Sequence, residues 1–308
     1  MVAGPFICQA VLWFFIPEGI RLQSIRASEL KHHLKPVIVL FVPILAMQVY
    51  HIMDKTMLGI MSTYEQSGYY YNADKVINIP FSIIFGLGTV ILPRISNLIQ
   101  QNNQEKMATV FRTYLCAISC LSLAMAFGIA AIAPKFTPLF FGNEFIPCIV
   151  LIVLLSPALW LKAISTTVAQ SYLIPTKSEK IYVVSVICGA AVNLIVNLIL
   201  IPRYEAIGAV LGTVVAEAVV TIIQIIWIQK ETNICDFYKE GVVLVGAGAI
   251  MFICVRLVSG ALFGWFTVFL EIITGVIVYT SIVFLYCKLV PDTSISKLVT
   301  SLLKQNKK

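Results

Sequence analysis

The sequence predicts an all-α, polytopic membrane protein with about nine transmembrane helices. Of its 308 residues, 59% are hydrophobic and only 12% are charged, and the mean hydropathy is +0.92. Ordinary soluble domains carry roughly 25% charged residues, and a single soluble core could not hide this much apolar surface. The apolar residues also fall into repeated runs that reach or approach the ~20 residues a helix needs to cross a bilayer.

These apolar runs follow one another along the chain with short polar stretches between them. They are Met1–Ile16, Pro36–Met61, Tyr69–Leu98, Ala108–Ala133, Phe145–Leu173, Ile181–Ile201, Ala206–Ile228, Gly241–Leu262 and Phe266–Leu289. The first run is the weakest, because it is short and starts at Met1. No positive residue precedes it, so we interpret it as a spanning helix, whole or incomplete, rather than a signal peptide.

Basic residues predict the orientation of these spans, since Lys and Arg accumulate on the cytoplasmic side. Alternate connections carry them, beginning with Pro17–Lys35 and ending with the C-terminal tail, while the intervening loops hold few. We therefore expect the basic connections to be cytoplasmic. The net charge of +7 then reflects topology and contact with anionic lipid, not nucleic-acid binding.

Motifs of soluble chemistry are absent from the sequence. It contains no G-x-x-x-x-G-K-[ST] phosphate loop, no C-x-x-C among its eight cysteines, and no histidine spacing suited to zinc. The predicted outer loops are short as well. We therefore predict that the protein is not an enzyme and needs no cofactor, and that its function lies within the membrane.

Ionisable residues inside the spans are the candidate functional residues, because a charge at the bilayer centre costs about 2.5–3.5 kcal/mol and normally faces a partner or a wet cavity. Asp54 and Lys55 lie toward the outer end of the second span, and Asp74 and Lys75 lie at similar depth in the third. A crossed pairing of Asp54 with Lys75 and of Lys55 with Asp74 is geometrically possible. These charges either line the outer mouth of a hydrophilic cavity and gate it, or form an ion-pair staple at the interface.

The third span also carries a polar stripe, because its polar and small residues recur at three- or four-residue intervals and so share one helix face. The stripe consists of Tyr71, Lys75, Asn78, Ser82, Gly86 and Thr89. We count Asn78 with the cavity-lining residues.

Two further spans place one ionisable residue each on a polar face. Glu217 lies near the midplane of the seventh span, where it either faces a cavity and binds a coupling cation or proton, or pairs with another helix. Lys162 of the fifth span lies close enough to the cytoplasm to snorkel there, and lining the cavity is the equal alternative.

Two other polar pairs favour structural roles. Asn193 and Asn197 share a face of the sixth span, as residues that join helices do. Arg256 and Glu271 belong to the last two spans at comparable depth, and we expect them to form an ion pair.

Three stretches carry a family resemblance: LKPVIVLFVPILAMQVYHIMDKTMLG over Leu34–Gly59, YYYNADKVINIPFSIIFGLGTVILPRIS over Tyr69–Ser96, and IPRYEAIGAVLGTVVAE over Ile201–Glu217. Together they resemble the polysaccharide flippases of the multidrug/oligosaccharidyl-lipid/polysaccharide exporter superfamily, the Wzx-type translocases of repeat units linked to undecaprenyl pyrophosphate. The second stretch is also similar to the corresponding helix of the lipid II flippases. Glu205 stands where this family often has Gly after Tyr.

The resemblance implies two pseudo-symmetric six-helix lobes around a cationic central cavity, working by alternating access. It also implies that Lys75 matches the basic residue of a Y-A-D-[RK] segment that transport requires. The nine spans would correspond to helices six to fourteen of the family, so the N-terminal lobe is missing. The implied division is 1–16 as the last helix of that lobe, 17–35 as a basic cytoplasmic linker or amphipathic helix, 36–229 as a six-helix C-terminal lobe, 230–290 as two additional helices, and 291–308 as a basic cytoplasmic tail.

The implied function is translocation of undecaprenyl-pyrophosphate-linked oligosaccharide repeat units across the bacterial cytoplasmic membrane, for biosynthesis of capsule or O-unit polysaccharide. A drug/cation antiporter of the same superfamily, a membrane glycan polymerase, and a fragment that does not transport by itself remain as alternatives. The expected partners are the lipid-linked oligosaccharide, membrane lipids, a coupling ion, a separate N-terminal half and a polysaccharide polymerase, with no nucleic acid.

Overall fold

A computed structural model describes most of the chain beyond residue 51. The described residues are 52–101, 103–232, 234–260 and 264–297, with the single positions 11 and 34. The chain divides into two compact units, Met1–Leu45 and Ala46–Lys308, and every helix discussed below belongs to the second. The predicted first span, the basic linker, the first part of the second span and the end of the basic tail lie outside the described residues.

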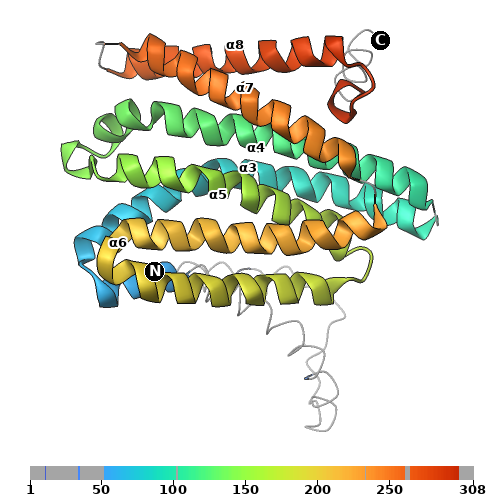
Figure 1. The fold of residues 1–308 in the computed structure, drawn as a ribbon, viewed down its shortest axis with the longest axis horizontal. Helices are drawn as coiled ribbons and strands as arrows, with labels where there is room; N and C mark the ends of the chain where they lie inside the picture. Colours follow the sequence, from blue (N-terminus) through green and yellow to red (C-terminus); the bar gives the residue numbers. More distant parts are fainter. Residues whose placement is uncertain are drawn as a thin grey trace. The chain divides into compact units, whose positions relative to one another are not determined.

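The described residues form helices and their connections, without any strand, which confirms the predicted all-α class (Figure 1). Residues 52–61 are helical. They are followed by α3 (Tyr64–Gln100), α4 (Gln104–Phe140), the short 3₁₀ helix η2 (Asn143–Phe145), α5 (Cys148–Val168) with its π-helical extension η3 (Ala169–Leu173), α6 (Glu179–Glu231), α7 (Cys235–Ser259) and α8 (Trp265–Leu289).

Six of these helices, counting α5 with η3 as one, are long and apolar enough to cross a membrane. The longest of them, α6, has 53 residues and would be ~80 Å long if straight, far more than a bilayer requires. It is instead a hairpin, because Glu205 has the non-helical angles φ 49° and ψ −126°, and Figure 1 shows the chain turning back there. The two arms are the predicted spans Ile181–Ile201 and Ala206–Ile228.

The tight turn of this hairpin depends on small residues. A Cβ atom added at Gly208 would lie 2.6 Å from the carbonyl carbon and oxygen of Leu200, a distance that real side chains do not tolerate. With α6 counted as two spans, the six helices give seven crossings among the described residues. The predicted total of nine also includes the first two spans, which lie largely outside that part of the chain.

The helices pack around α5, which contacts α3, α4 and α6, while α4 carries α7 and α8 on its other side. Figure 1 shows this order of helices, with α8 and the α6 hairpin on opposite sides. Two apolar clusters fill the interior. One includes Leu58, Tyr70, Leu155 and Ile201 near the α6 turn, and the other gathers where α3 ends and α4 begins.

The orientation of α3 determines which of its polar residues face the interior. The helix begins after Thr63, whose hydroxyl accepts a hydrogen bond from the Gln66 backbone amide at 3.3 Å. Its buried residues recur at helical spacing and define the inner face: Tyr70, Ala73, Ile77, Ile84 and Gly88. Most of the predicted polar stripe is exposed on the other side, and only Asn78 is half-buried.

Candidate functional site

A polar cavity of about 270 Å³ lies between the helix 52–61, α3, α5 and the second arm of α6. It brings together six of the seven residues that the sequence singles out. They are Asp54, Lys55, Asp74, Asn78, Lys162 and Glu217. The seventh, Lys75, does not line this cavity.

A continuous chain of polar contacts runs along one wall of the cavity. The Lys55 ammonium pairs with Asp74 at 2.8 Å, and the Asn78 amide nitrogen donates to the other Asp74 oxygen at 2.7 Å. The Lys162 ammonium donates to the Asn78 amide oxygen at 2.9 Å. Asn78 thus uses both ends of its carboxamide to connect an acid with a base, and Lys162 faces the cavity rather than the membrane surface.

Asp54 occupies a separate and more deeply buried cluster, where its residue is only 4% exposed. The hydroxyls of Tyr70 and Thr213 donate to one carboxylate oxygen at 2.7 and 2.8 Å. The Asn197 amide nitrogen donates to the other oxygen at 2.6 Å and also to the Asn193 amide oxygen at 3.1 Å. Three donors thus surround this carboxyl group within the membrane-spanning bundle, and such hydrogen bonds are strongest when the acceptor is ionised.

The crossed pairing expected from the sequence is therefore half correct. Lys55 pairs with Asp74 as expected, but Asp54 does not pair with Lys75. Consecutive residues on a helix point in directions about 100° apart, so Asp74 and Lys75 cannot both face the helix 52–61. Asp74 faces the cavity, and Lys75 is exposed on the outer side of α3.

Tyr71 connects Lys75 to the rest of the site. The Lys75 ammonium lies 4.5 Å from the centre of the Tyr71 ring, and the Lys55 ammonium lies 5.0 Å from the same ring. Such cation–π contacts orient a lysine without neutralising it. Lys75 also lines a second, larger and mostly apolar cavity between α3, α4 and α8.

The polar face of the second α6 arm divides between two roles. Glu217 is buried and lines the polar cavity. One turn further on, the Thr221 hydroxyl donates to the Leu161 carbonyl on α5 at 3.0 Å. Next, the Gln224 amide donates to the Ser185 hydroxyl on the first α6 arm at 3.0 Å. The deeper part of this face therefore joins helices.

Sequence reasoning missed the ligands of Asp54. It assigned Asn193 and Asn197 to helix joining, whereas the structure places Asn197 directly against the Asp54 carboxylate. Two asparagines spaced four residues apart in an otherwise apolar span were the available signal. Tyr70 and Thr213 gave a weaker signal, because a hydroxyl is common in membrane helices.

The charges of the polar cavity favour cation binding over anion binding. Its walls hold two bases, Lys55 and Lys162, and three acids, Asp54, Asp74 and Glu217, which sum to −1 if all are ionised. The described residues contain no group of three or more His, Cys, Asp or Glu side chains suited to a metal ion. Around Asp54, carboxylate, amide and hydroxyl oxygens predominate, and these are the ligands that hard cations prefer.

Comparisons with known proteins identify relatives. A family model described as "Polysaccharide biosynthesis protein" matches residues 1–150. The chain is 25% identical over 249 residues to the probable low-salt glycan biosynthesis flippase Agl15 of Haloferax volcanii, covering 77% of this chain and 50% of that protein. It is also 25% identical over 214 residues to the lipid II flippase MurJ of Bacillus subtilis, covering 68% of this chain and 38% of MurJ.

A solved structure shares the fold. The lipid II flippase MurJ in its inward closed conformation aligns with a TM-score of 0.76 and 17% identity, over 92% of this chain and 60% of the MurJ chain. The chain thus spans about half, or less, of the length of the curated relatives it matches. The sequence matches and the shared fold agree with the predicted family. This multi-pass membrane protein is a homologue of the flippases of the multidrug/oligosaccharidyl-lipid/polysaccharide exporter superfamily.

Proposed function

We propose that this protein takes part in moving undecaprenyl-pyrophosphate-linked oligosaccharide repeat units across the bacterial cytoplasmic membrane, by alternating access. The resulting lipid-linked units supply polysaccharide of the capsule or O-unit type. The proposal concerns transport, so no residue is assigned a catalytic role. The proposal includes a second lobe, formed by helices other than those described here. The greater length of the relatives supports the presence of such a lobe.

The observation that carries the proposal is an exposed lysine on the outer face of a membrane-spanning helix. Lys75 lies within α3, and the exposed residues Tyr71, Ser82 and Thr89 continue its polar face. Exposing a lysine to lipid costs free energy. An ammonium that faces the passage between two lobes can instead bind a pyrophosphate. We assign Lys75 to the pyrophosphate, with Tyr71 fixing its position.

The polar cavity has a different role in this proposal. Lys55 is already paired with Asp74, and Lys162 is held by Asn78, so neither base is offered to a phosphate. Among the described residues, the groups that donate hydrogen bonds to Asp54 are all neutral. A small monovalent cation would be held there by the Asp54 carboxylate, the Thr213 hydroxyl and amide oxygens of Asn193 and Asn197.

One atom in this cluster supports the cation site in particular. The amide oxygen of Asn197 is buried and has no hydrogen-bond partner among the described residues, and the same holds for the amide nitrogen of Asn193. Buried amide atoms are rarely left without partners. A cation beside Asp54 would supply a partner for the Asn197 oxygen, and so would make cation binding compete with the present Asn197–Asp54 hydrogen bond.

Export of the lipid-linked glycan in cells tests the phosphate role. Lys75→Ala should reduce export at least tenfold while the protein level stays within twofold of wild type. Lys106→Ala is the matched control, because Lys106 is an exposed lysine outside both cavities, and it should export normally. Normal export by Lys75→Ala at normal expression would rule out this role.

The coupling role needs a separate comparison. Asp54→Asn should abolish the dependence of export on a sodium or proton gradient, since it removes the charge that holds the cation. Glu217→Gln leaves the Asp54 cluster intact and should keep that dependence. If Glu217→Gln instead loses the dependence on the gradient and Asp54→Asn keeps it, the coupling ion binds at Glu217 and not at Asp54.

A further inference from the structure

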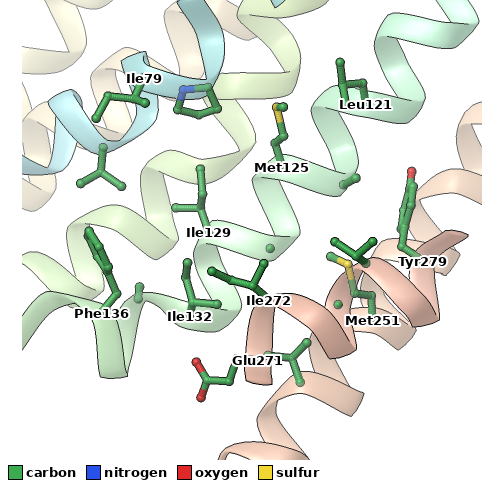
Figure 2. Close-up of a pocket in the computed structure, with 18 of the residues that line it drawn as sticks. Ile79, Leu121, Met125, Ile129, Ile132, Phe136, Met251, Glu271, Ile272 and Tyr279 are labelled. Carbon is green, nitrogen blue, oxygen red and sulfur yellow. The ribbon is translucent and has the colours of Figure 1, made fainter. Parts of the chain in front are cut away.

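Buried charges line two cavities, and the surroundings of these charges differ. The larger cavity, of about 1150 Å³, is mostly apolar, and Figure 2 shows Glu271 of α8 among apolar side chains on its wall. The Glu271 carboxylate has no hydrogen-bond partner among the described residues, and the ion pair expected with Arg256 does not form, because Arg256 is exposed on α7. The polar cavity of about 270 Å³ instead places a base, Lys162, and an acid, Glu217, in one space.

The Lys162 ammonium is held by neutral groups alone among the described residues. It donates to the Asn78 amide oxygen at 2.9 Å and lies 4.4 Å from the centre of the Phe81 ring. An ammonium has three N–H donors, and inside a membrane-spanning helix an incompletely compensated charge is costly. A carboxylate would satisfy this ammonium better than an amide does, because a hydrogen bond between two charged groups is the stronger one.

Glu217 lies at a depth that the Lys162 ammonium can reach. The Thr221 hydroxyl donates to the Leu161 carbonyl at 3.0 Å, which fixes the register of the second α6 arm against α5. These two helices run in the same direction, so Glu217 lies one turn, ~5.4 Å, toward the N-terminal end of α5. Helical side chains lean toward the N-terminus of their own helix. A change of rotamer along the four-carbon stem of Lys162 can therefore carry the ammonium from Asn78 to Glu217.

The surroundings of Glu217 allow such a second partner. Glu217 is only 6% exposed and has a contact of its own. A carboxylate accepts several hydrogen bonds at once, so this contact leaves room for an ammonium. Lys55 is paired with Asp74, which leaves Lys162 as the base of this cavity that can balance Glu217.

A cation at Asp54 would influence this choice of partner. Thr213, which donates to Asp54 at 2.8 Å, precedes Glu217 by one turn on the same helix face. A cation bound by Asp54 and Thr213 would therefore lie near Glu217 and repel a second positive charge there.

We propose that the Lys162 ammonium exchanges between Asn78 and Glu217, and that a cation at Asp54 shifts it toward Asn78. This inference rests on the cation site of the proposed function and adds an internal charge that responds to its occupancy. Asn78 is also bonded to Asp74, so an ammonium on Asn78 connects α5 with α3, and an ammonium on Glu217 connects α5 with α6. Cation binding would thereby change which helices are held together.

A double-mutant cycle on the thermal unfolding of the purified full chain in detergent tests the exchange. Lys162→Gln with Glu217→Gln should unfold several degrees above the temperature obtained by adding the two single shifts, because the double variant leaves neither charge without its partner. Lys162→Met repeats the cycle with a second neutral side chain. Glu179→Gln is the matched control for the acid, since Glu179 is exposed and outside both cavities, and its shift should add to that of Lys162→Gln.

Stabilisation by sodium tests the opposition between Lys162 and the cation, and it requires no glycan substrate. Unfolding is followed against sodium chloride, with choline chloride keeping the ionic strength constant. Lys162→Gln should lower the sodium concentration that gives half of the stabilisation by about fivefold or more, and this effect should shrink to about twofold or less when Glu217→Gln is also present. Lys106→Gln makes the same change at an exposed position outside both cavities and should leave that concentration unchanged.

Additive shifts in the double-mutant cycle would overturn the exchange. An unchanged or raised sodium concentration for Lys162→Gln would overturn the opposition to the cation. If sodium does not stabilise the wild type at all, the cation site at Asp54 in the proposed function is contradicted, and the cycle alone then decides whether Lys162 and Glu217 interact.

Discussion

Replacing Gly212 by alanine probes the Asp54 cluster without touching any polar group. Gly212 lies in the second arm of α6, one residue before Thr213. A Cβ atom at this position would lie 2.0 Å from the Asn197 amide oxygen and 3.0 Å from its amide carbon. The Asn197 side chain must therefore move, and its 2.6 Å hydrogen bond to Asp54 would be lost or lengthened.

The size of the effect follows from two opposing contributions. A hydrogen bond to a charged group contributes about 1.5–3 kcal/mol, and Gly→Ala in a helix interior returns up to ~1 kcal/mol of helix propensity. With the full gain in propensity, the net loss for Gly212→Ala is about 0.5–2 kcal/mol. Gly246→Ala is the matched control, because α7 offers nothing within 4 Å of an added Cβ at Gly246, and it should be neutral or stabilising.

Thermal unfolding of the two variants in the same detergent measures this difference. Gly212→Ala should unfold several degrees below Gly246→Ala, since ~1 kcal/mol corresponds to a few degrees for a chain of this length. Its export should also respond less steeply to the coupling ion. If the two variants unfold together and respond alike, Asn197 is not a structural ligand of Asp54 and the reasoning fails.

Three further predictions concern single contacts. Glu205→Gly should raise the unfolding temperature by the equivalent of about 1 kcal/mol, because a non-glycine residue at φ 49°, ψ −126° is strained; a lowered temperature would contradict this. Tyr172→Phe should lower the free energy of unfolding by about 1–3 kcal/mol, because it removes the 2.8 Å hydrogen bond to Glu231. Tyr114→Phe should leave that free energy unchanged, because the Tyr114 hydroxyl is buried without a partner among the described residues. Equal losses in the two variants would refute this contrast. A double-mutant cycle on Lys55 and Asp74 should give a coupling energy of at most about 1 kcal/mol, because both side chains are partly exposed, at 30% and 22%, and a coupling above about 2 kcal/mol would contradict that.

The fold could be predicted well because lipid imposes a simple length rule on apolar runs. The predicted span Tyr69–Leu98 lies inside α3, and Ala108–Ala133 lies inside α4. Both helices extend beyond the apolar run into polar residues, where Thr63 and Asn103 cap their first turns. Capping extends a helix without adding hydrophobicity, so hydropathy alone marks the membrane part and not the ends.

Which residues share the polar cavity could also be predicted, because ionisable side chains inside a membrane bundle have few places to go. Their pairing could not. Asp74 and Lys75 are neighbours in the sequence but face different surroundings, and only the rotation of α3 about its axis decides which of them enters the cavity. That rotation is set by Tyr70, Ala73 and Ile77 packing inward.

The surroundings of Asp54 and Glu271 were beyond sequence reasoning for a related reason. Asn197 reaches Asp54 across 143 sequence positions, and only the packing of the helix 52–61 against both arms of α6 brings them together. Glu271 and Arg256 have matching depth and opposite charge, yet they lie on faces of α8 and α7 that do not meet. Depth along a helix can be counted from the sequence, whereas the direction around its axis cannot.

Flipping in reconstituted liposomes tests most directly whether this protein moves a pyrophosphate-linked oligosaccharide. The protein is incorporated with a fluorescent lipid-linked oligosaccharide, and a membrane-impermeant reductant reports how fast the label reaches the outer leaflet. Wild type and Lys106→Ala should accelerate this exchange over protein-free liposomes, and Lys75→Ala should slow it at least tenfold at equal incorporation. No acceleration by correctly incorporated wild-type protein, or an undiminished rate for Lys75→Ala, would contradict the account.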